Sequence, residues 1–257
     1  MDTIGDMAVD TITASTITGY ASRRSLTATN ATIRRDITAL SRLLASCVAW
    51  GYRQDNPARF YDRSLLRERR EPIQPPDPRD VATVIAAAPP AMAKVLRLLD
   101  QSGMRTNEAV ALAADEIFLD RRQIALTRTK TNRPRTIPFV TPGGDASTAL
   151  VDLPRHGPLF PSGTGKPYAN FPTHAAKVIA LAEAREKKAG RPFRRFRVHD
   201  LRHGFAIRWL RNGGNLYNLS KHLGHSSVVT TEVSYVRYLT TQEQDYARTG
   251  SGEMVSA

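Results

Sequence analysis

Five side chains with acid–base or anion-binding chemistry stand close together near the C-terminal end of the chain: His199, Arg202, His203, His225 and Tyr235. On a helix, positions 199, 202 and 203 share one face, because spacings of three and four residues bring side chains together. Guanidinium and imidazole donors on one face suit a phosphate group, and a tyrosine hydroxyl becomes a nucleophile once its proton is removed. The pattern therefore indicates a phosphate site served by a tyrosine.

Two short helices are expected to position parts of this site. The helix around His199 carries Leu201, Phe205 and Leu210 on its opposite face, a stripe that suits burial. Farther upstream, Thr106 can cap a short helix that has Glu108 favourably placed in its first turn.

The chain divides by composition into a short first part and a longer second part. Apolar residues repeat at three and four between Thr32 and Trp50, which predicts an amphipathic helix. The periodicity of residues 1–30 is weak, so this segment is poorly specified, with partly helical structure left open, and 32–50 is the one clear helix. The Pro-rich segment 72–78 follows, which we interpret as a linker. The expected domains are residues 1–71 and 79–257.

The second part is expected to contain a small sheet among helices. Residues 123–127 and 136–140 read as two strands of a β-hairpin with a basic tip, and residues 174–188 read as a helix. The predicted fold class is mainly α with a small antiparallel β-sheet (α+β). The basic residues of the hairpin tip are Arg128, Lys130, Arg133 and Arg135.

Composition favours a nucleic-acid partner. The 257 residues carry a formal net charge of +13, and the pI is about 10.4, so the chain is drawn to polyanions. No apolar run reaches membrane-spanning length, and the acidic N-terminus does not resemble a secretory signal. The single cysteine, Cys47, cannot form an internal disulfide and suits a reducing cytoplasm. We therefore expect a cytoplasmic, nucleoid-associated protein with no membrane partner.

Several motifs in order resemble those of the tyrosine recombinase or phage integrase family, across roughly residues 78–240. The segment SGMRTNEAVAL is similar to the first arginine motif, TRTKTNRPRTIPF to the hairpin that carries a catalytic lysine, and HDLRH and LGH to the second and third boxes. Tyr235 follows them as the nucleophile that the resemblance implies. One short motif is weak evidence, whereas these five features in the right order make chance an unsatisfactory explanation. The catalytic residues that the resemblance implies are Arg105, Lys130, His199, Arg202, His225 and Tyr235, supported by Glu108 and His203.

The implied reaction cuts and rejoins DNA strands through a 3′-phosphotyrosyl link, without metal, ATP or other cofactor. Arg105 and Arg202 suit the phosphoryl oxygens, because a guanidinium fork binds phosphate in bidentate fashion. His199 is the expected acid–base partner of the tyrosine, Lys130 the donor to the leaving oxygen, and His225 a donor to the phosphoryl group. DNA-contacting arginines are expected outside the catalytic set: Arg34, Arg35, Arg128, Arg133, Arg194, Arg195 and Arg197.

Three alternatives stay open at this point. Tyr238 competes with Tyr235 as the nucleophile, since it lies three residues farther along the same predicted helix. The histidines at 199, 203, 222 and 225 have a spacing that can hold zinc, although Arg202 would repel a cation. A DNA-binding remnant or regulator of a mobile element that has lost catalysis would carry the same basic surface.

The resemblance also implies an assembly. The expected active unit is a homotetramer that joins two double-stranded DNA sites, with an accessory DNA-bending factor as a further partner. Relatives carry a core-binding domain of several helices that closes around the duplex as a clamp. Because residues 1–71 predict one helix, a short, truncated clamp is expected here.

Overall fold

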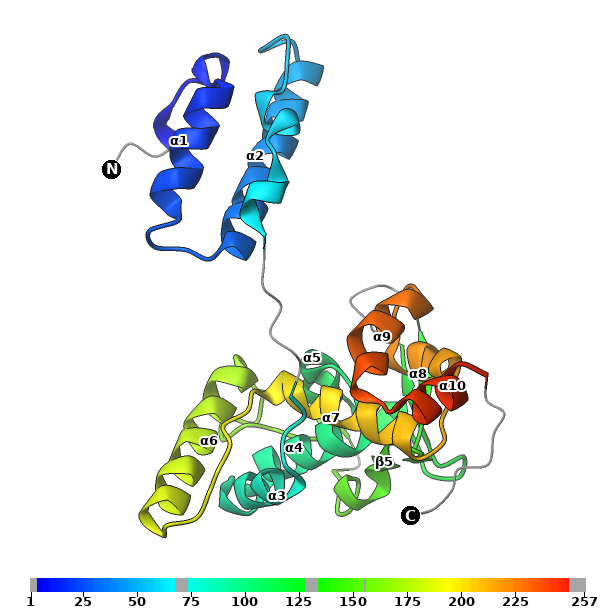
Figure 1. The fold of residues 1–257 in the computed structure, drawn as a ribbon. Coiled ribbons are helices and arrows are strands. Elements are labelled where there is room, and N and C mark those ends of the chain that lie inside the picture. Colours follow the sequence, from blue (N-terminus) through cyan, green and yellow to red (C-terminus); the bar gives the residue numbers. More distant parts are fainter. Residues whose placement is uncertain (1–3, 68–73, 128–133, 155, 250–257) are drawn as a thin grey trace. The chain divides into compact units, whose positions relative to one another are not determined.

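The computed structural model describes residues 4–67, 74–127, 134–154 and 156–249, and the chain separates into two compact units. Met1–Pro72 forms the N-terminal unit, and Ile73–Ala257 forms the C-terminal unit (Figure 1). None of the helices within the described ranges is long and apolar enough to cross a membrane.

Two α-helices, preceded by 3₁₀ turns at Ile4–Asp6 and Val9–Thr11, build the described part of the N-terminal unit. Helix α2 (Asn30–Ala49) confirms the amphipathic helix predicted between 32 and 50, and it buries Ile33, Ile37 and Leu44. Two 3₁₀ turns follow, Pro57–Phe60 and Arg63–Leu66, and both pack against α2.

Helix α1 (Ala14–Arg24) lies in the segment that the sequence specifies poorly, so the expectation of one clear N-terminal helix is wrong. Its sequence is rich in Thr, Ser and Gly, whose helix propensities are low. Thr13 begins the helix with a capping box that includes Thr16, and Ile17 and Ala21 are buried in the same apolar cluster as Ile33. Tertiary packing and capping therefore stabilise a helix that propensity alone does not favour.

The C-terminal unit is mainly helical, as predicted. It contains a three-stranded antiparallel sheet in the order β1-β2-β3 and a two-stranded ribbon, β4-β5. The strands are β1 (Ile117–Phe118), β2 (Gln123–Leu126), β3 (Arg135–Pro138), β4 (Val140–Thr141) and β5 (Gly144–Asp145). The helices are α3 (Pro78–Ala87), α4 (Pro90–Ser102), α5 (Thr106–Ala111), α6 (Phe171–Lys188), α7 (Val198–Arg211), α8 (Leu216–Leu223), α9 (Val228–Tyr235) and α10 (Thr241–Thr249).

The predicted hairpin and the predicted helix over 174–188 are both present. Strand β2 pairs antiparallel with β3, with Ile124 opposite Ile137, and both side chains are fully buried. The turn between the strands falls outside the described residues. Helix α6 begins at Phe171, three residues earlier than predicted, and Phe171 is buried in the core.

Helix α7 is the central element of the C-terminal unit. It contacts α4, α6, α8, α9 and α10, which surround it in Figure 1. The buried ring of Phe205 explains two glycines in neighbouring segments: a Cβ on Gly103 would lie 2.4 Å from that ring, and one on Gly143 would lie 2.5 Å from it. These close approaches hold the end of α4 and the β4–β5 turn against α7, where the predicted chemistry lies.

Candidate active site

The first arginine of the site stands where helix α4 gives way to α5. Gly103 ends α4 in a left-handed conformation with a φ of 63°, and Arg105 follows as the N-cap residue of α5. The carboxylate of Glu108 accepts a hydrogen bond from the Arg105 backbone N–H at 2.8 Å, which pairs an amide at the helix start. The expectation that Thr106 caps this helix is wrong, because Thr106 is its first helical residue.

The carboxylate of Glu108 holds two arginine side chains. Arg135 donates from Nη1 to Oε1 at 2.9 Å and from Nη2 to Oε2 at 2.7 Å, and Arg105 donates from Nη1 to Oε1 at 3.0 Å. Burial acts to raise the pKa of Glu108, but the hydrogen bonds and charge of Arg135, with the hydrogen bonds of Arg105, outweigh it and lower the pKa to about 2. The carboxylate is therefore ionised at neutral pH and fixes both guanidinium groups.

The C-terminal end of helix α8 gathers three arginines. The backbone carbonyls of residues 222, 223 and 224 accept hydrogen bonds at 2.9, 2.7 and 2.9 Å from Arg135, Arg202 and Arg105, in that order. The last carbonyls of a helix lack partners within it and carry the negative end of the helix dipole. Glu108 pairs with Arg105 and Arg135, whereas the hydrogen bonds of Arg202 go to neutral acceptors. Positive charge is therefore in excess at this point and suits an anion.

Arg202 lies deepest in this cluster. Its side chain is 3% exposed, and its Nη1 donates to the carbonyl of Gly103 at 2.8 Å. Burial, followed by the charge of Arg105, lowers the pKa of Arg202 to about 10, so the guanidinium is still positive at neutral pH.

His225 contacts Arg202 directly. The Nη2 of Arg202 lies 3.3 Å from Nε2 of His225, and Nδ1 of His225 lies 2.7 Å from the Thr231 hydroxyl. Because arginine only donates, Nε2 accepts and Nδ1 carries the proton. Burial and then the charge of Arg202 lower the pKa of His225 to about 4, which leaves the ring neutral at pH 7.

His199 and His203 lie on one face of α7, as their spacing predicts. Their rings meet edge to face with centroids 4.8 Å apart. His199 is the more exposed of the two, and partial burial and then the charge of Arg202 lower its pKa.

Tyr235 points into the same region from the end of helix α9. Its side chain is 2% exposed, and its hydroxyl lies 3.0 Å from Nδ1 of His203. Burial raises the pKa of Tyr235, and the charge of Arg202 lowers it in part. The phenol is therefore protonated at neutral pH.

Tyr238 has a different environment. Helix α9 ends at Tyr235, and Tyr238 belongs to the following 3₁₀ turn, so the two tyrosines do not share a helix as predicted. Within the described part of the chain, the buried hydroxyl of Tyr238 has no hydrogen-bond partner. The hydroxyl of Tyr235 therefore meets a histidine, whereas that of Tyr238 does not within the same described residues.

The remaining predicted residues of the C-terminal unit are exposed or outside the described residues. Lys130, Arg128 and Arg133 lie in the segment 128–133, which the structure does not describe. The exposed arginines before α7 all have local partners: Arg194 donates to the side chain of Gln74 and to the carbonyl of Pro75, Arg195 pairs with Glu183, and Arg197 pairs with Asp200. A hollow of about 310 Å³ between α6 and the start of α7 lies beside Arg195, Arg197 and His199.

Arg135 is the site residue that sequence reasoning missed. It is the first residue of β3 and its side chain is 10% exposed, so its assignment to the basic tip of the hairpin is wrong. A signal was available in the strand pattern, because side chains two apart on a strand share a face. Arg135 is two residues from Ile137, which is fully buried, and so it faces inward.

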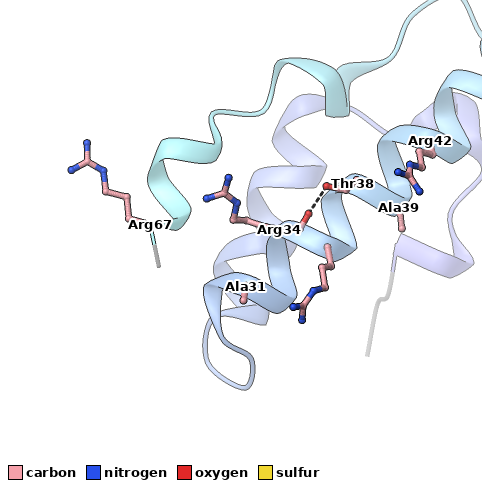
Figure 2. A pocket seen from close by; sticks show the side chains of 7 residues that line it. Ala31, Arg34, Thr38, Ala39, Arg42 and Arg67 are labelled. Atoms are coloured by element: carbon pink, nitrogen blue, oxygen red, sulfur yellow. Dashed lines mark hydrogen bonds between the residues drawn. The ribbon is translucent and has the colours of Figure 1, made fainter. Parts of the chain in front are cut away.

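A separate basic surface lies on the N-terminal unit. Helix α2 and the residue after the second 3₁₀ turn border an open groove of about 730 Å³, and Figure 2 shows the guanidinium groups around it. The residues that line this groove are Ala31, Arg34, Arg35, Thr38, Ala39, Arg42 and Arg67.

The histidines do not form a ligand cluster in the described ranges, where no three His, Cys, Asp or Glu side chains come together to hold a metal ion. Instead, Nε2 of His222 lies 2.7 Å from the carbonyl of Ser102, and Nε2 of His225 faces Arg202.

Arginines, neutral histidines and a buried tyrosine gathered around one central helix define the class of the tyrosine recombinases. Residues 79–242 match the family model of the phage integrase family. The chain belongs to this family.

Curated relatives and solved structures agree with this assignment. The integrase of Escherichia phage P2 is 29% identical over 236 residues, 91% of this chain and 64% of the relative. The tyrosine recombinase XerC of Bradyrhizobium diazoefficiens is 34% identical over 152 residues, 55% of this chain and 44% of the relative. The chain thus spans about half to two thirds of the length of these proteins.

Among solved structures, the Tn1549 transposon integrase in complex with transposon right-end DNA superposes with a TM-score of 0.75 at 18% identity, over 96% of this chain and 87% of that one. A lambda integrase dimer bound to a core site gives a TM-score of 0.71 at 14% identity, over 98% of this chain and 86% of that one. At these identities the likeness concerns the fold.

Proposed function

We propose that the chain is a site-specific recombinase of a mobile genetic element that cuts and rejoins DNA strands through a 3′-phosphotyrosyl intermediate. The observation that carries the proposal is the meeting of the Tyr235 hydroxyl with His203 beside the buried Arg202. A nucleophile next to an anion site is what attack on a phosphodiester requires.

The positive cluster supports the phosphate part of this proposal. Arg105 and Arg202 would bind the nonbridging oxygens of the scissile phosphate, since both are already oriented by helix-end carbonyls. His225 would help to orient the guanidinium of Arg202, because its Nε2 accepts a hydrogen bond from Nη2 of that arginine. The negative charge that develops on the nonbridging oxygens would be stabilised by guanidinium donors that are already oriented.

Lys130 would protonate the leaving 5′ oxygen, a role that the family resemblance implies. The product of the first step is a covalent protein–DNA link. A 5′-hydroxyl from a second duplex then attacks the phosphotyrosine, which joins the two strands and frees the tyrosine. Because bond energy is conserved in the link, the reaction consumes no ATP, and none of its steps calls for a metal.

DNA would contact both units in this proposal. The arginine-lined groove of the N-terminal unit and the exposed arginines 194, 195 and 197 of the C-terminal unit offer positive charge to the phosphate backbone. The two-helix N-terminal unit would act as a short core-binding domain. A lambda integrase tetramer has been solved on a Holliday junction, which supports a tetramer on two DNA sites for this chain.

The test is formation of a covalent adduct on a nicked suicide duplex, taken from DNA that flanks the gene. Wild type should form an adduct that survives a denaturing gel, with chelator present. The adduct should vanish in Tyr235→Phe and persist in the matched control Tyr238→Phe. An adduct that survives in Tyr235→Phe would disprove the nucleophile, and salt-sensitive binding without any adduct would indicate a DNA-binding remnant.

A further inference from the structure

The hydroxyl of Tyr235 makes its hydrogen bond to His203 rather than to His199, which the resemblance names as its acid–base partner. The hydroxyl oxygen and Nδ1 of His203 are 3.0 Å apart, and the two ring centroids are 5.6 Å apart. His199 contacts the ring of His203 from one helical turn away.

The surroundings of His203 fix the direction of this hydrogen bond. Burial, followed by the nearby His199, lowers the pKa of His203 to about 4, and the raised pKa of Tyr235 keeps the phenol protonated. The neutral ring therefore accepts at Nδ1 from the phenolic O–H, with its own proton on Nε2.

Charged groups on α7 oppose one another at His203. Arg197, Arg202 and His199 disfavour a positive ring, whereas Asp200 favours one. From the neighbouring helix α9, the group that faces His203 is the Tyr235 phenol itself.

We propose that His203 is a catalytic residue, the base that takes the phenolic proton of Tyr235 as the tyrosine oxygen attacks phosphorus. The inference rests on the proposed function and deepens it. The bond between the tyrosine oxygen and phosphorus forms while the bond from phosphorus to the 5′ oxygen breaks. The phenolic proton moves to Nδ1, and the leaving 5′ oxygen receives its proton from a separate donor.

The reverse step uses the same groups. When a 5′-hydroxyl attacks the phosphotyrosine, the imidazolium of His203 returns its proton to the departing tyrosine oxygen. Asp200, in the first turn of α7, would stabilise the transient positive ring. His199, exposed on the same face, is then free to serve the phosphate or the leaving group.

The test compares single-turnover adduct formation between pH 6 and 9 in wild type, His203→Gln and His199→Gln, all as full-length chains. Glutamine retains a hydrogen-bond acceptor for the tyrosine but cannot take up a proton. With its base neutral throughout this range, wild type should show a nearly flat pH profile. His203→Gln should be slower by about 10²- to 10⁴-fold and should gain about tenfold per pH unit, because the phenolate fraction then limits the rate.

His199→Gln is the matched control from the same helix face, and its pH profile should stay flat even if its rate falls. A flat pH profile for His203→Gln, whatever the size of its rate constant, would overturn the proposal and reduce His203 to a positioning role. Melting temperature and DNA affinity equal to those of wild type establish that the variant is folded. If His203→Gln melts early, His203→Asn takes its place.

A second substrate separates the base from the leaving-group acid. Sulfur in place of the bridging 5′ oxygen leaves without protonation, so it should rescue Lys130→Ala but not His203→Gln. Rescue of His203→Gln would overturn the assignment as base. Absence of any wild-type adduct, or an adduct in Tyr235→Phe, would instead contradict the proposed function itself.

Discussion

Arg202 is a buried cation whose own hydrogen bonds go to neutral acceptors. It donates to the carbonyls of Gly103 and Leu223, which lie at the C-terminal ends of α4 and α8 and stabilise positive charge only in part. Removing a charge from water costs several kcal/mol when its pairing is incomplete. Because this desolvation already occurs during folding, an arriving phosphate would meet a fixed and dehydrated guanidinium.

His222 is a second buried titratable residue, and it predicts how stability depends on pH. Its ring packs against Phe205 and Trp209, with centroids 5.1 and 5.0 Å away. Burial lowers the pKa of His222 to about 4, whereas a histidine in the unfolded chain titrates near 6.5. The unfolded state therefore binds more protons between pH 6.5 and 4, so stability falls as the pH drops through that window.

The free energy of unfolding should fall by about 3 kcal/mol at pH 4 because of His222. Urea unfolding at pH 7, 5.5 and 4 would measure it in wild type and in His222→Phe, which takes up no proton at this position. The variant should lose less stability on acidification than wild type. His174→Phe, exposed on α6, is the control that should keep the wild-type slope, and equal slopes for all three proteins would refute the argument.

The side chain of Arg135 joins strand β3 to the end of helix α8. Arg135 pairs with both oxygens of Glu108 and with the carbonyl of His222. Arg135→Gln would leave Glu108, whose side chain is 5% exposed, with Arg105 as its remaining ionic partner. Removing one partner of a buried pair destabilises by about 3 kcal/mol, so a lower free energy of unfolding and less adduct are expected.

The matched control for Arg135 is Arg191. It also makes two hydrogen bonds to one carboxylate, that of Glu186, but its side chain is half exposed. Arg191→Gln should change the urea midpoint far less than Arg135→Gln, since water screens the exposed pair. Similar midpoints for the two variants would show that Arg135 does not have the structural role argued here.

The elements also show what sequence can predict here. Helix α2 has a clear apolar repeat and was found, whereas α1 depends on contacts with α2 that local pattern does not reveal. The alternation of β3 contains enough information to turn Arg135 inward. The contact between His203 and Tyr235 spans 32 residues, and it arises from the packing of α9 on α7, which periodicity cannot supply.

The whole chain carries a net charge of +13, and part of this charge is concentrated in one groove. On the N-terminal unit the groove along α2 gathers Arg34, Arg35, Arg42 and Arg67. Phosphates that bind such a surface release counterions, so DNA affinity should fall linearly with salt on logarithmic axes. These contacts position the duplex and carry little sequence information.

Arg34 and Arg35 therefore predict a measurable change in the salt dependence of DNA binding. Fluorescence anisotropy of a labelled duplex between 50 and 200 mM salt gives the slope of log affinity against log salt concentration. Each arginine that contacts a phosphate should add about one to the magnitude of this slope. The double variant Arg34→Gln, Arg35→Gln should bind more weakly at every sequence and lose about two from the slope. Arg24→Gln is the control on the same unit, because Arg24 is held by Asp36 and should leave the slope unchanged. An unaltered slope in the double variant, or an equal loss in Arg24→Gln, would mean that the groove of the N-terminal unit does not face DNA.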